Sequence, residues 1–184
     1  MMAALYAFCR DNNYPLFVQD EKYFKKYERE IRELYSVGIP PTQNRVSIHV
    51  RRAKNPIDPN EPAYHENSFY VDLGHHLHED MSDNYYVRAM ALFPDEEFIV
   101  FSDDIDWCKK QPMFKDCLFA HGTELEDLNQ MASCKSNIIA NSSFSWWAAF
   151  LNKNPDKIVI APKQWFADIN NEHLIGIPKK WIRI

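Results

Sequence analysis

Short apolar runs alternate with amphipathic stretches along most of this chain. Runs of β-branched residues predict strands, and apolar residues at three- and four-residue spacing predict helices. Strands are predicted at 45–50, 97–101, 117–120, 138–140 and 157–161, and helices at 84–93, 104–111, 124–133 (with Thr123 as N-cap) and from about Phe144 onward. Strands that alternate with helices indicate an α/β protein with a parallel, Rossmann-like sheet.

The segments outside this alternation complete one predicted domain, 1–184. An N-terminal helical segment, 1–36, has a charged periodic helix at 20–35, and a connector with Gly38 and Pro40 follows it. The polar stretch 52–80 is long for a loop in a compact domain, and loops of that length are often functional. A closing helix or tail is predicted at 165–184.

Composition restricts the class of protein. Of the 184 residues, 46% are apolar and 26% are charged, with a net charge of −5, which is typical of a soluble globular protein and gives no basic stripe for nucleic acid. No apolar run is long enough for a transmembrane helix, and no signal peptide is recognisable. The four cysteines lack Cys-x-x-Cys spacing, so reduced thiols and a cytoplasmic location are expected. A homo-oligomer remains an open option.

Polar side chains follow three of the predicted strands. They are His49 and Arg51 after the first strand, Asp103 and Asp104 after the second, and the turn 141–145 before the last predicted helix. Ligands of open parallel sheets bind beyond the carboxyl ends of the strands. Arginine, carboxylate and hydroxyl groups at one edge favour an anionic ligand with a polar head, such as a nucleoside diphosphate. The four glycines form neither a Gly-x-Gly-x-x-Gly nor a P-loop motif.

The turn and the double arginine each have two interpretations. Asn141, Ser142 and Ser143 precede a helix N-terminus, which binds phosphate well, although a plain serine N-cap explains them equally. If the strand continues past Val50, His49 and Arg51 share one face and can approach one ligand, whereas Arg52 lies on the other face. The guanidinium fork of Arg51 suits a diphosphate, but a solvated strand end is an equal alternative.

The acidic run after the second predicted strand has four interpretations. Asp103, Asp104 and Asp106 could bind a metal, form the nucleophile motif of a haloacid-dehalogenase-like phosphatase, or cap a helix. We favour guanine recognition by Asp103 or Asp104, because a carboxylate can accept paired hydrogen bonds from the guanine N1 and N2 groups. No metal site is therefore predicted.

Five blocks together resemble a known family. They are 46–52, 98–108, 127–135, 138–149 and 158–166. In this order they are similar to the α-1,2-fucosyltransferase family, family 11 of the glycosyltransferases. The resemblance implies a GT-B fold whose C-terminal Rossmann-like half binds GDP-fucose, and inverting, metal-independent transfer of fucose to a glycan acceptor, with no cofactor.

The residue argument and the resemblance together give the predicted site. Arg51 and His49 are the catalytic candidates; the donor-binding candidates are His49, Arg51, Asp103, Asp104, Asn141, Ser142, Ser143, Phe144 and Ser145. The general base stays open among His49, Glu66, Asp72 and Asp80. Family members usually continue the double arginine with Gly-Asp-Tyr, where this chain has Ala53-Lys54-Asn55, and usually carry a longer N-terminal region. The alternative function is a catalytically silent GDP-sugar-binding remnant or partner subunit.

Overall fold

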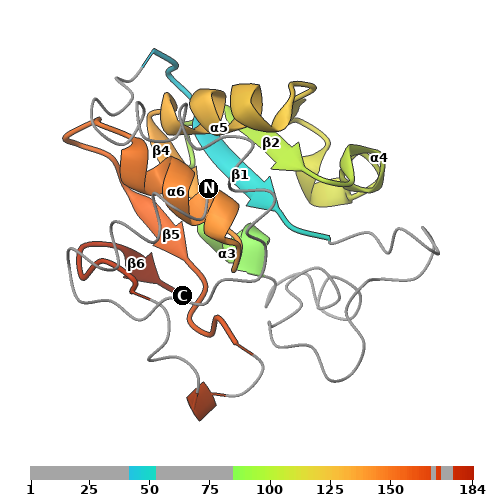
Figure 1. The fold of residues 1–184 in the computed structure, drawn as a ribbon. Coiled ribbons are helices and arrows are strands. Elements are labelled where there is room, and N and C mark those ends of the chain that lie inside the picture. The colour runs from blue at the N-terminus through green and yellow to red at the C-terminus, as the bar shows by residue number, and fades with distance from the viewer. Residues whose placement is uncertain (1–41, 53–84, 167–168, 171–175) are drawn as a thin grey trace, which may run out of the picture.

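The computed structural model describes residues 42–52, 85–166, 169–170 and 176–184. Among these residues a six-stranded sheet has β1 (Val46–Val50), β2 (Phe98–Ser102), β3 (Leu118–Phe119), β4 (Ser136–Ile138), β5 (Val159–Ala161) and β6 (Ile182–Arg183) (Figure 1). The predicted N-terminal helical segment 1–36 and nearly all of the predicted loop 52–80 lie outside the described residues.

The strand order is β3-β2-β1-β4-β5-β6, and every pair in the sheet is parallel. The chain therefore builds outward from β1 to β3, returns to the other side of β1, and builds outward again to β6. This is the doubly wound order of a Rossmann-like sheet, with its reversal between β1 and β4. The α/β, Rossmann-like fold predicted from the sequence is confirmed.

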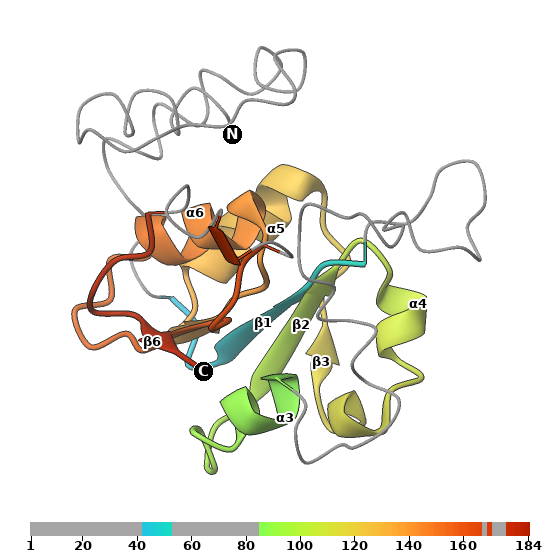
Figure 2. The same cartoon turned by 90° about the horizontal axis from the view of Figure 1, so that it is seen from below.

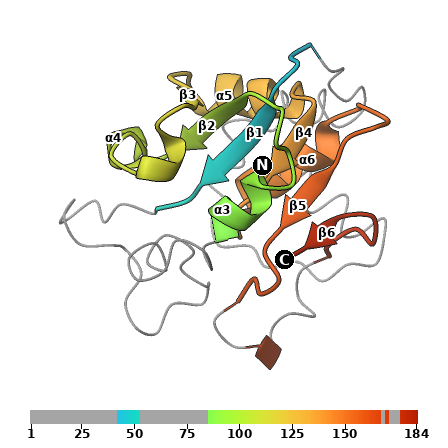
Figure 3. The same ribbon diagram turned by 180° about the vertical axis from the view of Figure 1, so that it is seen from behind.

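Helices cover both faces of the sheet. The helices of the described residues are α3 (Tyr85–Met90), α4 (Ile105–Cys108), the 3₁₀ helix η2 (Pro112–Phe114), α5 (Glu124–Ala132) and α6 (Ser143–Leu151). Helices α5 and α6 lie side by side on one face and α3 lies on the other, as Figures 2 and 3 show. Side chains alternate accordingly, because Val100 packs in the α3 cluster while Ile99 and Phe101 pack in the α5–α6 cluster.

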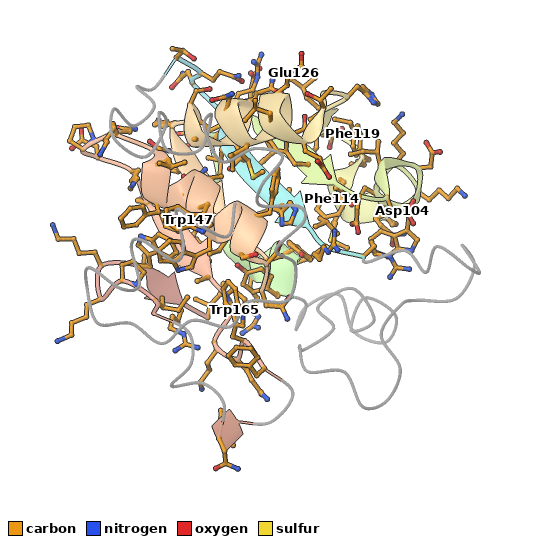
Figure 4. The ribbon with its side chains drawn as sticks, in the orientation of Figure 1. Asp104, Phe114, Phe119, Glu126, Trp147 and Trp165 are labelled. Carbon is orange, nitrogen blue, oxygen red and sulfur yellow. The ribbon has the colours of Figure 1, made fainter. Side chains whose placement is uncertain are left out.

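Helix α6 is almost wholly apolar and is packed firmly onto the sheet. Trp146 and Trp147 are buried core residues in the same cluster as Trp165. Figure 4 shows Trp147 and Trp165. The Trp146 ring stacks on Phe150, and its indole N–H donates to the carbonyl of Gly176. The core thus fixes the N-terminus of α6 relative to the strand ends.

Most predicted elements are shorter in the structure than in the sequence prediction, and two differ in their position or type. The strand predicted at 138–140 is β4, Ser136–Ile138, because the ladder with β1 begins at the polar residues Ser136 and Asn137. The segment predicted as a closing helix or tail contributes the edge strand β6, which pairs with β5 and is too short to show a pattern of its own. In both cases tertiary pairing outweighed local apolar content.

A buried polar network joins β1, β4 and the end of α6. The fully buried Asn137 amide donates to Ser47 Oγ at 2.7 Å and to the Met131 carbonyl at 2.8 Å. Asn152 completes the network by donating to Asn137 Oδ1 at 2.9 Å and to the carbonyl of Cys134. These partners satisfy amide groups whose burial would otherwise be costly, and they set the position of β4 against β1.

The N-terminus of α5 has the predicted cap. Thr123 accepts a hydrogen bond from the Glu126 N–H, and the Glu126 carboxylate accepts one from the Thr123 N–H, which forms a capping box. Replacing Thr123 with alanine should lower the free energy of unfolding by about 1 kcal/mol, because the cap is lost. Urea denaturation would measure this, with Thr123→Ser, which keeps the hydroxyl, as the control. An unaffected alanine variant would show that the cap contributes nothing to stability.

Candidate functional site

The two ladders of the central strand differ in length at the C-terminal end of the sheet. β1 pairs with β2 over five residues up to Val50↔Ser102, but with β4 over only three, up to Ile48↔Ile138. The backbone of His49 has therefore left the β4 ladder while it still pairs with β2. This lies at the reversal of strand order, the position where ligands of doubly wound sheets bind.

Arg51 and Asp103 come together just beyond the last β1–β2 pair. Arg51 Nη1 lies 3.0 Å from Asp103 Oδ2, and the other carboxylate oxygen accepts a hydrogen bond from the backbone N–H of Arg52 at 2.8 Å. The side chains of Arg51 and Asp103 are 44% and 25% exposed, so the guanidinium remains accessible to a ligand. One carboxylate thus joins the ends of two neighbouring strands.

Arg52 has a different environment from Arg51, as the alternation along the strand predicted. Its guanidinium carbon lies 4.2 Å from the ring centroid of Trp107, a residue of α4. Its Nε is buried and has no hydrogen-bond partner in the described part of the chain. Cation–π stacking on Trp107 therefore gives Arg52 a packing role, and the arginine left accessible at the strand end is Arg51.

His49 lies between the arginine pair and α6. Its ring is 5.5 Å from the Phe144 ring, and its backbone carbonyl accepts a hydrogen bond from the Tyr86 hydroxyl at 3.1 Å. Burial lowers the pKa of His49 to about 3; the Asp103 carboxylate opposes this shift and the Arg51 guanidinium adds to it. The imidazole is therefore neutral at physiological pH. Its buried Nδ1 has no hydrogen-bond partner among the described residues.

The turn 141–145 brings the start of α6 to the same edge. Ser142 is the N-cap, because its hydroxyl accepts the Phe144 N–H at 3.3 Å. Asn141 donates to the carbonyl of Trp165, and the buried Ser145 hydroxyl bonds the carbonyls of Ala140 and Ser142. Asn141 and Ser145 thus shape the turn, and Ser143 is exposed at the first helical position. What the turn can offer an anion is backbone N–H groups and the positive end of α6.

The three acidic residues after β2 do not point to one place. Asp104 is the N-cap of α4, accepting the Trp107 N–H at 3.2 Å, and it begins α4 in Figure 4. Asp103 faces Arg51, and Asp106 is exposed in the first turn of α4. Within the described ranges no three His, Cys, Asp or Glu side chains are grouped closely enough to hold a metal ion.

The structure gives roles to three residues outside the predicted site. Trp107 supports Arg52, Tyr86 holds the carbonyl of His49, and the Ser102 hydroxyl accepts the N–H of Asp104 at 3.0 Å. Sequence signals existed for Ser102, which stands next to Asp103 after the second predicted strand, and for Trp107, which lies in the same block 98–108. Tyr86 acts through a helix whose place against β1 depends on tertiary packing.

The fold and site are those of a Rossmann-like domain that presents an arginine and a helix N-terminus at its switch point. Over residues 67–184 the sequence matches the family model described as Glycosyl transferase family 11, and the chain belongs to this family. The family resemblance inferred from the five sequence blocks is thereby confirmed. No solved structure matches the chain at a comparable level of significance. None of the described helices combines the length and apolar character that crossing a membrane requires.

Two curated relatives come from Escherichia coli. The chain is 32% identical over 189 residues to an α-1,2-colitosyltransferase, an alignment that covers 91% of this chain and 61% of the relative. It is 34% identical over 153 residues to the O-antigen biosynthesis glycosyltransferase WbnK, covering 77% of this chain and 45% of that protein. The chain therefore spans less than two thirds of the length of either relative.

Proposed function

We propose that this protein is a glycosyltransferase that moves fucose from GDP-fucose to a glycan hydroxyl by inverting displacement without a metal ion. The observation that carries the proposal is the convergence of Arg51, His49 and the α6 N-terminus at the β1–β4 switch point. Membership of glycosyltransferase family 11 and the similarity to a colitosyltransferase support a sugar-transfer reaction.

The leaving diphosphate is the group that this site suits best. In glycosyl transfer the transition state resembles an oxocarbenium ion, and negative charge builds on the departing group. Arg51 offers a guanidinium fork for two phosphate oxygens, and the α6 N-terminus offers N–H groups and a positive dipole. Asp103 holds Arg51, and the buried face of α6 holds the helix N-terminus, so both groups are in place before the reaction. Such preorganisation is the condition for effective electrostatic stabilisation.

His49 suits a ligand contact better than proton abstraction. A general base works best when its pKa lies near the working pH, and burial keeps the pKa of His49 at about 3. Its unpartnered Nδ1 can instead form a hydrogen bond with the bound sugar nucleotide. Glu66, Asp72 and Asp80 remain the candidates for the base, and they lie outside the described residues. Guanine recognition by Asp103 or Asp104 stays a prediction.

Nucleotide binding and metal dependence test this function. GDP at about 100 times its dissociation constant should stabilise the protein by about 2.7 kcal/mol and raise Tm by roughly 5–10 °C, with UDP as the matched control. Release of GDP from GDP-fucose with a panel of glycan acceptors should continue in excess EDTA, because Arg51 and α6 supply the positive charge.

Each outcome has a distinct meaning. An unchanged Tm in millimolar GDP would refute the donor site. Binding of GDP with no transfer to any acceptor would identify the silent GDP-sugar-binding protein instead. If EDTA abolishes the activity and Mg²⁺ or Mn²⁺ restores it, the mechanism depends on a metal ion, and the acidic run 103–106 is again a candidate metal site.

A further inference from the structure

Each oxygen of the Asp103 carboxylate contacts a residue that directly follows β1. Oδ2 lies 3.0 Å from Arg51 Nη1, and Oδ1 accepts the Arg52 N–H at 2.8 Å. The register explains why, since Val50 pairs with Ser102 and the next position places Arg51 opposite Asp103. The carboxylate therefore fixes both the course of the backbone after β1 and one nitrogen of the guanidinium.

We propose that Asp103 is a positioning residue that orients the Arg51 guanidinium toward the donor's diphosphate. The proposal rests on the proposed function of this site. A guanidinium has five N–H donors, so a carboxylate on one Nη1 leaves donors on the other side of the fork for phosphate. The Arg51 side chain is 44% exposed, and without Asp103 it would sample many rotamers and lose part of its orientation before the ligand binds.

The competing role for Asp103 is recognition of guanine, which its place in the sequence also suggests. Guanine would need both carboxylate oxygens, one for the N1–H and one for the N2–H. In the structure each oxygen already receives a donor from Arg51 or Arg52, so guanine would have to use the acceptor sites that remain beside these two contacts. The electrostatic influence of both Asp103 and Arg51 on the buried His49 agrees with a single shared site.

Asp103→Asn tests this role with little change of shape. Asparagine keeps an oxygen for the Arg52 N–H but loses the charge that holds Arg51. Isothermal titration calorimetry should show GDP binding weakened by about tenfold, because a charge-assisted contact that orients the fork is gone. Inosine diphosphate, which lacks the guanine N2 amine, should lose affinity by the same factor. Added to Arg51→Lys, the substitution should cause little further loss, since residues that act as a unit are not additive.

The matched control is Asp106→Asn, which removes the same charge from an exposed position in the first turn of α4 and should bind GDP like the wild type. Thermal unfolding of each variant checks that the fold is kept. If Asp103→Asn does not fold, Asp103→Glu takes its place. This variant retains the charge, so it should keep part of the wild-type affinity for GDP.

Three results would overturn the proposal. A loss for GDP much larger than for inosine diphosphate would make Asp103 a guanine-binding residue. Unchanged or tighter GDP binding by Asp103→Asn would show that the ion pair does not help the ligand. If the losses of GDP affinity caused by Asp103→Asn and Arg51→Lys add fully in the double variant, the two side chains act independently. Failure of the proposed function is recognised differently, because the wild type itself would then bind neither nucleotide.

Discussion

Replacing Arg51 with lysine is expected to weaken GDP binding by about tenfold to a hundredfold and to reduce sugar transfer by at least as much. Lysine keeps the positive charge but replaces a planar fork by a single ammonium group, so one of two parallel hydrogen bonds to the diphosphate is lost. Its single nitrogen also cannot hold Asp103 Oδ2 and present a fork to the diphosphate at the same time, as the guanidinium can. The dissociation constant of GDP and the initial rate of transfer from GDP-fucose would measure the two effects.

Arg52→Lys is the matched control for this experiment. The two arginines are adjacent in sequence, but the Arg52 guanidinium lies over the Trp107 ring, and only the backbone N–H of Arg52 bonds Asp103. The control should therefore retain most of the GDP affinity and lose about 0.5–1 kcal/mol of stability with the cation–π contact. Equal GDP affinity for the wild type and Arg51→Lys would mean that Arg51 does not bind the diphosphate.

The stability of the protein is expected to fall as the pH drops below about 6.5, and His49 should account for a large part of the loss. In the unfolded chain His49 takes up a proton near its ordinary pKa of 6.5, whereas in the folded protein burial holds the pKa at about 3. Between these two values the unfolded state binds more protons, so the free energy of unfolding decreases as the pH falls. For His49 alone the decrease from pH 7 to pH 5 is about 2 kcal/mol.

Urea denaturation at pH 7 and pH 5 would isolate this contribution. His49→Gln removes the titrating group, so between the two pH values its free energy of unfolding should decrease by about 2 kcal/mol less than that of the wild type. His121→Gln, at an exposed position, is the matched control, and its free energy of unfolding should decrease between the two pH values by about as much as that of the wild type. An NMR titration gives a direct check on the folded wild type, because protonation of the His49 ring above pH 5 would contradict the burial argument.

Local patterns were sufficient to predict the framework of the sheet. The runs that became β1 and β2 are apolar and β-branched, and Thr123 with Glu126 has the spacing of a capping box, so each signal is contained within a few neighbouring residues. The alternation of strands and helices then restricts the connections to parallel crossovers. Strand β6 could not be predicted, because two exposed residues become a strand only by pairing with β5.

The candidate site could be predicted as a set of strand ends but not as a set of contacts. Sequence alternation predicted that Arg51 and Arg52 would point apart if the strand continued. The strand β1 ends at Val50, yet the two side chains do have different partners, Asp103 and Trp107. It could not show that Asp103 meets Arg51, since that depends on the register of β1 against β2. Nor could it show that Asn141 and Ser145 bond nearby backbone carbonyls, because their types suit a phosphate site and a tight turn equally well.

The central position of β1 has a consequence for the order in which this domain folds. Its contacts bridge long stretches of chain, with 52 positions between the paired residues Val46 and Phe98 and 90 between Ser47 and Asn137. The elements from α5 to β5, by contrast, follow one another closely and can associate after closing only short loops. Because loop-closure entropy is lost before distant contacts can compensate for it, we infer that β1 docks late, between two partly assembled halves. The strand that carries His49 and the residues leading to Arg51 would then take its place only when the rest of the sheet is present, so a nascent chain could not display the proposed donor-binding edge prematurely.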